Sequence, residues 1–100
     1  MYAKIFEVNK PAWARLAALI KENTPKGASV IDIGAGPGEP TTTMAKLLET
    51  HTFALTDSQV RMIENAKRRA AGLNNIEFHV ASAEDLSAFP TASFDAATYV

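Results

Sequence analysis

Apolar positions along the chain follow two spacings, one typical of helices and one typical of strands. Three stretches with apolar residues three or four places apart predict amphipathic helices around Trp13–Ile20, Thr41–Leu48 and Val60–Ala70. Four shorter runs rich in β-forming residues predict strands over residues 29–33, 52–56, 76–80 and 94–100. Because strands and helices alternate, the pattern predicts βαβ units, and therefore a mostly parallel sheet.

Turn residues divide this pattern. Pro25, Lys26 and Gly27 form a turn before the first predicted strand. We therefore expect an N-terminal helical segment over residues 1–26, followed by a single α/β domain over residues 27–100. The fold class is predicted to be a doubly wound, mostly parallel Rossmann-like sheet with a leading helix. Gly72 is predicted to end the third helix, with Leu73 packing back over its last turn.

Composition narrows the function classes. A net charge of -1 over 100 residues gives no long-range attraction for nucleic acid or for an anionic membrane, so neither is expected as a partner. The basic run Lys67–Arg69 is interpreted as a solvated helix face. The absence of cysteine excludes thiolate nucleophiles and sulfur metal sites, and no metal site is predicted. The longest apolar stretch is shorter than the roughly 18 residues of a membrane helix, and no secretory signal is evident, so a cytoplasmic location is expected, with an organellar one as the alternative.

A glycine-rich turn carries the strongest functional signal. In the run from Asp32 to Gly38, glycines at 34, 36 and 38 lie between the first predicted strand and the next helix. Glycine can adopt positive φ and lets a ligand approach the backbone, which is typical of a nucleotide-type site. Since ligands of parallel sheets bind at the carboxyl ends of strands, we expect Asp57, Ser58 and residues 82–85 to meet this turn at one edge.

The residues around the turn favour a cationic ligand without phosphates. The dinucleotide pattern GxGxxG fails at Glu39, whose charge at the start of a helix would repel a pyrophosphate. The Walker pattern GxxxxGK[ST] is absent as well. Asp32 and Glu39 suit a positively charged ligand such as S-adenosylmethionine, which has a sulfonium and an ammonium group. Asp57 lies 19 residues beyond Gly38, near the roughly 20-residue offset of an acid that binds ribose.

Three segments in order carry a family resemblance. VIDIGAGPG resembles motif I of the class I S-adenosylmethionine-dependent methyltransferases, LTDSQVRMIENAK resembles their second-strand region, and VASAEDLSAFPTASFDAATYV resembles the segment that follows. The resemblance extends to members that methylate quinone precursors and other small molecules. It implies S-adenosylmethionine as the cofactor and these cofactor-binding residues: Asp32, Gly34, Ala35, Gly36 and Gly38 at the turn, Asp57 and Ser58 at the ribose, and Ser82, Ala83 and Glu84 near the adenine. Ser82 stands where many family members have an aspartate that contacts the adenine, so Asp85 is an alternative contact.

The expected activity is methyl transfer to a small-molecule acceptor, in which the protein mainly aligns the reactants and excludes water. No catalytic base is identified, since His51 and His79 are isolated and Asp95 is expected to be structural. The family fold continues beyond a fourth strand, so we expect the chain to be the N-terminal portion of a longer protein, with little activity alone. Two alternatives remain: a nicotinamide-dependent oxidoreductase, disfavoured by Glu39, and a non-catalytic cofactor-binding remnant. Asp57 could also serve as a helix cap.

Overall fold

The computed structural model describes residues 4–7, 13–34, 38–81 and 94–99. These residues form three helices and five strands, none of the helices being long and apolar enough to cross a membrane. In chain order the elements are β1 (Lys4–Glu7), α1 (Trp13–Asn23), β2 (Ser29–Ile33), α2 (Thr41–Leu47), β3 (Thr52–Asp57), α3 (Val60–Arg69), β4 (Ile76–Val80) and β5 (Ala96–Tyr99).

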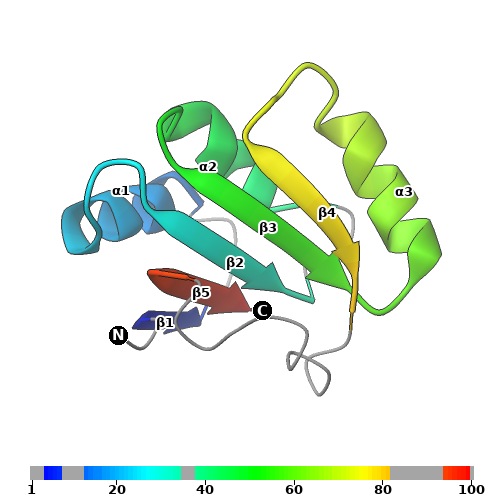
Figure 1. Ribbon diagram of the computed structural model, residues 1–100, viewed down its shortest axis with the longest axis horizontal. Coiled ribbons are helices and arrows are strands. Elements are labelled where there is room, and N and C mark those ends of the chain that lie inside the picture. The colour runs from blue at the N-terminus through cyan, green and yellow to red at the C-terminus, as the bar shows by residue number, and fades with distance from the viewer. Residues whose placement is uncertain (1–3, 8–12, 35–37, 82–93, 100) are drawn as a thin grey trace.

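The strands form one sheet in the order β1-β5-β2-β3-β4, and every neighbouring pair is parallel (Figure 1). Asp32 pairs with Leu55 between β2 and β3, and Asp57 pairs with Val80 between β3 and β4. The carboxyl ends of these three strands therefore share one edge of the sheet. The parallel sheet and the three helices predicted from the sequence are confirmed.

One strand was not predicted. Residues Lys4–Glu7 form β1, which pairs with β5, so the segment over residues 1–26 is not helical throughout. The predicted strand over residues 94–100 begins in the structure at Ala96, and Asp95, the residue before it, contacts Ser29. Its Oδ2 accepts the Ser29 N–H at 2.9 Å, and its own N–H donates to the Ser29 carbonyl at 2.7 Å. These bonds confirm the structural role expected of Asp95.

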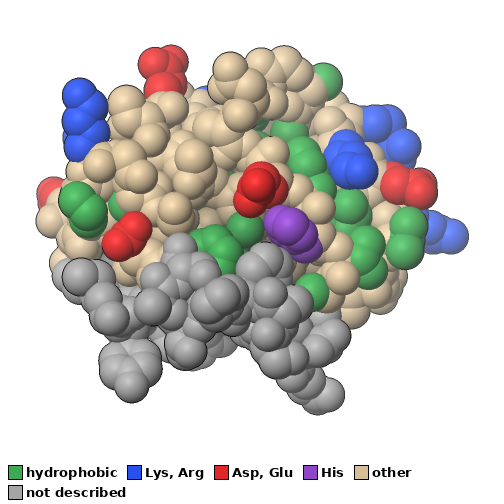
Figure 2. All heavy atoms as spheres, viewed as in Figure 1, with side chains coloured by type: hydrophobic (Ala, Val, Ile, Leu, Met, Phe, Trp, Pro, Cys, Tyr) green, Lys and Arg blue, Asp and Glu red, His purple; other side chains and the backbone are tan. Residues whose placement is uncertain are grey.

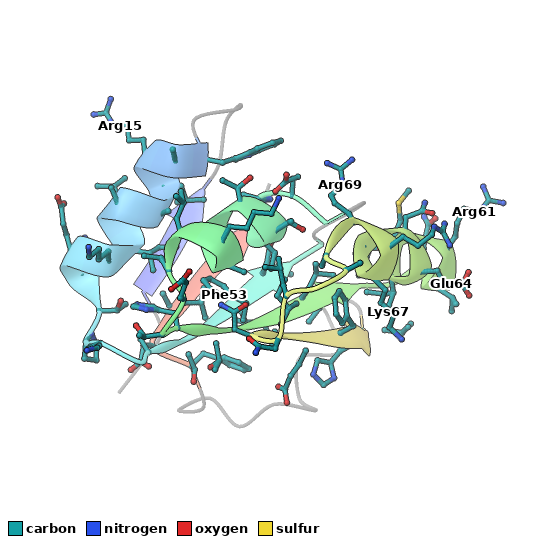
Figure 3. All side chains as sticks on the ribbon, turned by 90° about the horizontal axis from the view of Figure 1, so that it is seen from above. Arg15, Phe53, Arg61, Glu64, Lys67 and Arg69 are labelled. Atoms are coloured by element: carbon teal, nitrogen blue, oxygen red, sulfur yellow. The ribbon has the colours of Figure 1, made fainter. Side chains whose placement is uncertain are left out.

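The three helices cover one face of the sheet, and Figure 3 shows them side by side over it. Phe53 of β3 lies beneath α2 in this view and is fully buried with Val30 of β2. The larger core cluster joins these side chains to α1 and α2 through Leu16, Ala17, Ile20, Met44, Ala45 and Leu48. A second cluster packs Ile63 and Ala66 of α3 on Leu55. Each large apolar side chain buried in this way contributes about 1.5–3 kcal/mol to the free energy of unfolding. This packing holds the turns between strands and helices in place.

Candidate cofactor site

The glycine turn joins the end of β2 to the start of α2. Gly34 has a φ of 66° and Gly38 a φ of 113°, so both ends of the turn use backbone conformations that favour glycine. At Gly34 a Cβ atom would meet nothing within 4 Å, whereas at Gly38 it would lie 3.2 Å from the Cα and Cβ atoms of Ala66. Gly34 thus provides the bend, and Gly38 also permits a close approach to α3. Ala35 and Gly36 lie outside the described residues.

Gly38 is held from the other side by α2. Its carbonyl oxygen accepts the Thr42 N–H at 2.8 Å and the Thr42 hydroxyl at 2.8 Å. The second half of the turn is therefore fixed between the first residues of α2 and the middle of α3.

Asp32 lies at the fully buried centre of β2, on the face covered by the helices. Its Oδ2 accepts a hydrogen bond from the Thr41 hydroxyl, and its backbone carbonyl accepts one from the Thr56 hydroxyl at 2.9 Å. Its Oδ1 is buried and has no hydrogen-bond partner among the described residues. Asp32 thus connects the strand before the turn with the first residue of the helix after it.

Burial raises the pKa of Asp32 from 3.8 to about 7, because a charged carboxylate is poorly solvated inside the sheet. The hydroxyls of Thr41 and Thr98 lower this pKa, and the charge of Glu39 raises it. Near neutral pH a large fraction of Asp32 is therefore protonated. The interpretation that Asp32 suits a cationic ligand stays a prediction.

Glu39 lies at the start of α2, as the sequence indicated, and its carboxylate contacts two other residues. Oε1 accepts the Thr43 N–H at 3.0 Å and the Thr43 hydroxyl at 3.0 Å. Oε2 lies 3.7 Å from Nη1 of Arg69 at the end of α3. Neither partner of Glu39 was predicted from the sequence. Glu39 accepts a hydrogen bond from a backbone N–H at the start of α2 that a phosphate would otherwise accept. This contact disfavours a pyrophosphate ligand at the turn.

Asp57 ends β3 and is half-buried, with Ser58 exposed beside it. Its Oδ1 accepts the Gln59 N–H at 2.9 Å, directly before α3 begins. This bond closes a turn before the helix, whereas the N-cap of α3 is Gln59 and has no side-chain cap hydrogen bond, so Asp57 is not the helix cap. β2 and β3 are parallel, with Asp32 opposite Leu55, so Gly34, directly after β2, and Asp57, the last residue of β3, lie at the same edge of the sheet.

The end of β4 reaches the same edge, since the Ala81 N–H donates to the Asp57 carbonyl at 2.9 Å. Ser82, Ala83 and Glu84, the predicted adenine contacts, lie outside the described residues. Within the described part of the chain, no group of three or more histidine, aspartate or glutamate side chains could hold a metal ion.

Two cavities lie at the opposite, amino-terminal edge of the sheet. One of about 540 Å³ is lined by residues that include Lys46, Glu49 and Asn74, and one of about 560 Å³ by residues that include Lys21 and His51. Neither contains a predicted site residue. His51 is buried, with its Nε2 3.0 Å from the Thr24 hydroxyl and its ring stacked on Phe53. These contacts give His51 a role in packing.

Comparisons with known proteins agree with this geometry. A family model described as "Methyltransferase domain" matches residues 30–100. The chain is 33% identical over 69 residues to the rice (Oryza sativa subsp. japonica) protein 2-methyl-6-phytyl-1,4-hydroquinone methyltransferase 1, chloroplastic, a match that covers 69% of this chain and 20% of that protein.

Solved structures share the fold. A methyltransferase from Thiobacillus denitrificans, crystallised with S-adenosylhomocysteine, is 28% identical with a TM-score of 0.67, over 91% of this chain and 36% of that one. An rRNA methylase from Streptococcus thermophilus is 19% identical with a TM-score of 0.71, over 92% of this chain and 51% of that one. The chain thus spans between a fifth and a half of these relatives. The matched residues begin in β2 and include the glycine turn and Asp57, and the chain belongs to the methyltransferase domain family.

Proposed function

We propose that this chain binds S-adenosylmethionine at the carboxyl edge of β2, β3 and β4, as the cofactor-binding part of a methyltransferase that acts on a small molecule. The observation that carries the proposal is that Gly34, directly after β2, and Asp57, the last residue of β3, lie at the same carboxyl edge of the parallel sheet, within the region that matches the methyltransferase model. The Thiobacillus denitrificans relative was crystallised with S-adenosylhomocysteine, the product of such a transfer. The name of the rice relative, a hydroquinone methyltransferase, favours a small aromatic acceptor.

Each predicted residue has a proposed role at this edge. Gly34, Ala35, Gly36 and Gly38 admit the methionine and ribose portions of the cofactor against the backbone. Asp57 accepts hydrogen bonds from the ribose hydroxyls, with Ser58 beside it. Ser82, Ala83 and Glu84 contact the adenine. Asp32 acts indirectly, because its buried carboxylate holds Thr41 and so orients the turn.

Methyl transfer from a sulfonium is an in-line displacement: the bond from sulfur to the methyl carbon breaks as the acceptor atom forms its own, and the sulfur keeps the electron pair. The protein has to align donor and acceptor and to keep water out. Rigid strand ends suit this task. No described residue is assigned as a general base, and the acceptor pocket is not assigned to any described element.

The nicotinamide alternative is disfavoured by the contact between Glu39 and the Thr43 N–H, which occupies the start of α2. The non-catalytic alternative predicts cofactor binding without turnover. A cytoplasmic location and the absence of a nucleic-acid partner stay predictions from the sequence.

Calorimetric titration of the chain with S-adenosylhomocysteine and with NAD tests the proposal. Asp57→Asn keeps an oxygen for the Gln59 N–H but removes the charge that strengthens the bonds to the ribose. We expect this variant to bind S-adenosylhomocysteine about ten-fold more weakly. Glu64→Gln is the matched control, because Glu64 is an exposed acid on α3 that lies away from the turn. Figure 3 shows Glu64 in α3, farther from α2 than Arg69.

Tight binding of NAD with no response to S-adenosylhomocysteine would overturn the proposal. Equal affinities of the Asp57→Asn and Glu64→Gln variants would remove Asp57 from the site. Where the cofactor binds, a screen of hydroquinone acceptors with radiolabelled S-adenosylmethionine separates the enzyme from the non-catalytic alternative.

A further inference from the structure

The second half of the glycine turn rests on α3. A Cβ added to Gly38 would lie 3.2 Å from the Cα and Cβ atoms of Ala66, so the chain at Gly38 runs too close to α3 for a side chain to fit between them. One residue further along, Glu39 is bonded to Thr43 and lies 3.7 Å from the guanidinium of Arg69. Two consecutive residues of the turn thus contact two residues of α3 that lie three places apart, on one face of the helix.

The same helix begins at the predicted ribose acid. Asp57 accepts the Gln59 N–H, and α3 starts at Val60. Its other end carries Arg69, which Figure 3 shows at the end of α3 nearer α2, whereas Arg61 lies at the far end. A single helix of ten residues therefore contacts both parts of the proposed cofactor site: Asp57 at its start and the glycine turn along its second half.

Arg69 differs from the two cations that precede it. The Lys67 ammonium lies 6.0 Å from the centre of the Phe78 ring, toward β4. Arg68 donates a hydrogen bond to Asn65 within α3. Figure 2 shows Lys and Arg side chains gathered on the side of the molecule where Figure 1 places α3. Of the three basic residues 67–69, Arg69 is the one that contacts Glu39, the residue after Gly38.

We propose that Arg69 is a positioning residue of the cofactor site: through Glu39 it holds residues 38–40 against α3 and so sets the distance between the glycine turn and Asp57. This inference rests on the proposed function, since it assigns Arg69 a part in binding S-adenosylmethionine. An ion pair with one partner half exposed adds little to the free energy of unfolding. We expect the ion pair to act on the position of the turn, because small displacements of the turn change the affinity for the ligand.

The test compares Arg69→Gln with Arg68→Gln, which removes the same charge from the neighbouring position. Calorimetry should show S-adenosylhomocysteine binding about three- to five-fold more weakly to Arg69→Gln, with no change for Arg68→Gln. Glu39→Gln keeps an acceptor for the Thr43 N–H and should match Arg69→Gln. The double variant Glu39→Gln/Arg69→Gln should be no weaker than either single variant, because the two residues act through one contact. Arg69→Lys should restore part of the affinity.

Hydrogen exchange of the Thr43 amide, measured without ligand, tests the contact itself. Exchange should be about three-fold faster in Arg69→Gln than in Arg68→Gln, because a released Glu39 leaves the Thr43 N–H more often unpaired. Equal affinities of Arg69→Gln and Arg68→Gln, or additive losses in the double variant, would overturn the role of Arg69 in binding. Absence of any S-adenosylhomocysteine binding by the unmodified chain would overturn the proposed function, and the role of Arg69 in binding with it, while the exchange rates still decide whether the contact exists.

Discussion

At the scale of single residues, the two glycines that bound the turn make different demands. Gly34→Ala would place a Cβ in open space at a φ of 66°, which costs about 1 kcal/mol. Gly38→Ala would combine a φ of 113° with a contact of 3.2 Å to the backbone of Ala66, so we expect a loss of about 3 kcal/mol in the free energy of unfolding. Urea unfolding measures both, and equal losses would show that the contact with α3 yields easily.

Asp32 should make stability depend on pH. Its pKa is raised by burial from 3.8 to about 7, so between these values the folded state holds a proton that the unfolded state releases. Stability from this group is therefore fully present below about pH 4 and is lost as the pH rises through about 7, by on the order of 4 kcal/mol. Asp32→Asn is neutral at every pH and should lose most of this dependence. Urea unfolding at pH 5 and pH 8 measures it, and parallel behaviour of the two proteins would contradict the assignment.

Residue spacing predicted only part of the site. Gly34 and Asp57 follow a local pattern, since Gly34 directly follows β2 and Asp57 ends β3, and the parallel pairing of these strands puts both at one edge of the sheet. The partners of Glu39 and Asp32 could not be predicted in this way. Arg69 is 30 residues from Glu39 and belongs to a basic run that is typical of a solvated helix face. Such pairings depend on how elements distant in the sequence pack against each other, and the spacing of residues along one segment does not show this.

At the scale of elements, Asn75 connects three segments. Its Nδ2 lies 3.1 Å from the Ala45 carbonyl, 3.3 Å from the Leu48 carbonyl and 3.1 Å from the His51 carbonyl, so it binds the end of α2 and the start of β3. Asn75→Ala leaves these carbonyls without that donor, and we expect a loss of about 2 kcal/mol in the free energy of unfolding. Asn74→Ala is the matched control, because Asn74 is exposed and should change stability by about 0.5 kcal/mol or less. Similar losses for both variants in urea unfolding would contradict this role.

Helices and strands were predicted correctly where enough apolar residues repeat to reveal their spacing. The helices and strands β2, β3 and β4 each carry several apolar residues at a regular spacing, and their positions were predicted to within a few residues. Strand β1 was missed because Lys4–Glu7 has only two apolar residues, Ile5 and Phe6, between two charged ones. Its place in the sheet depends on pairing with β5, about 90 residues later in the chain.

At the scale of the whole molecule, the parallel sheet separates two edges. The glycine turn, Asp57 and Ala81 lie at the carboxyl edge, whereas both cavities are lined by residues near the amino ends of β3 and β4. A strand of five residues spans about 16 Å, which is longer than any direct contact between a ligand at one edge and a side chain at the other. The strand ends and the family match direct attention to the carboxyl edge.

Mapping by NMR distinguishes the two edges. On titration with S-adenosylhomocysteine, we expect the largest amide shifts at Gly34, Gly38, Asp57 and Ser58, because ligands of parallel sheets bind where the strands end. The amides of Lys46 and Asn74, which line a cavity at the amino edge, should stay unchanged. Lys46→Ala should likewise leave the affinity for S-adenosylhomocysteine as it is, since Lys46 lines both cavities but lies far from the turn. Shifts concentrated at the amino edge, with loss of affinity in Lys46→Ala, would move the ligand into the cavities and away from the glycine turn.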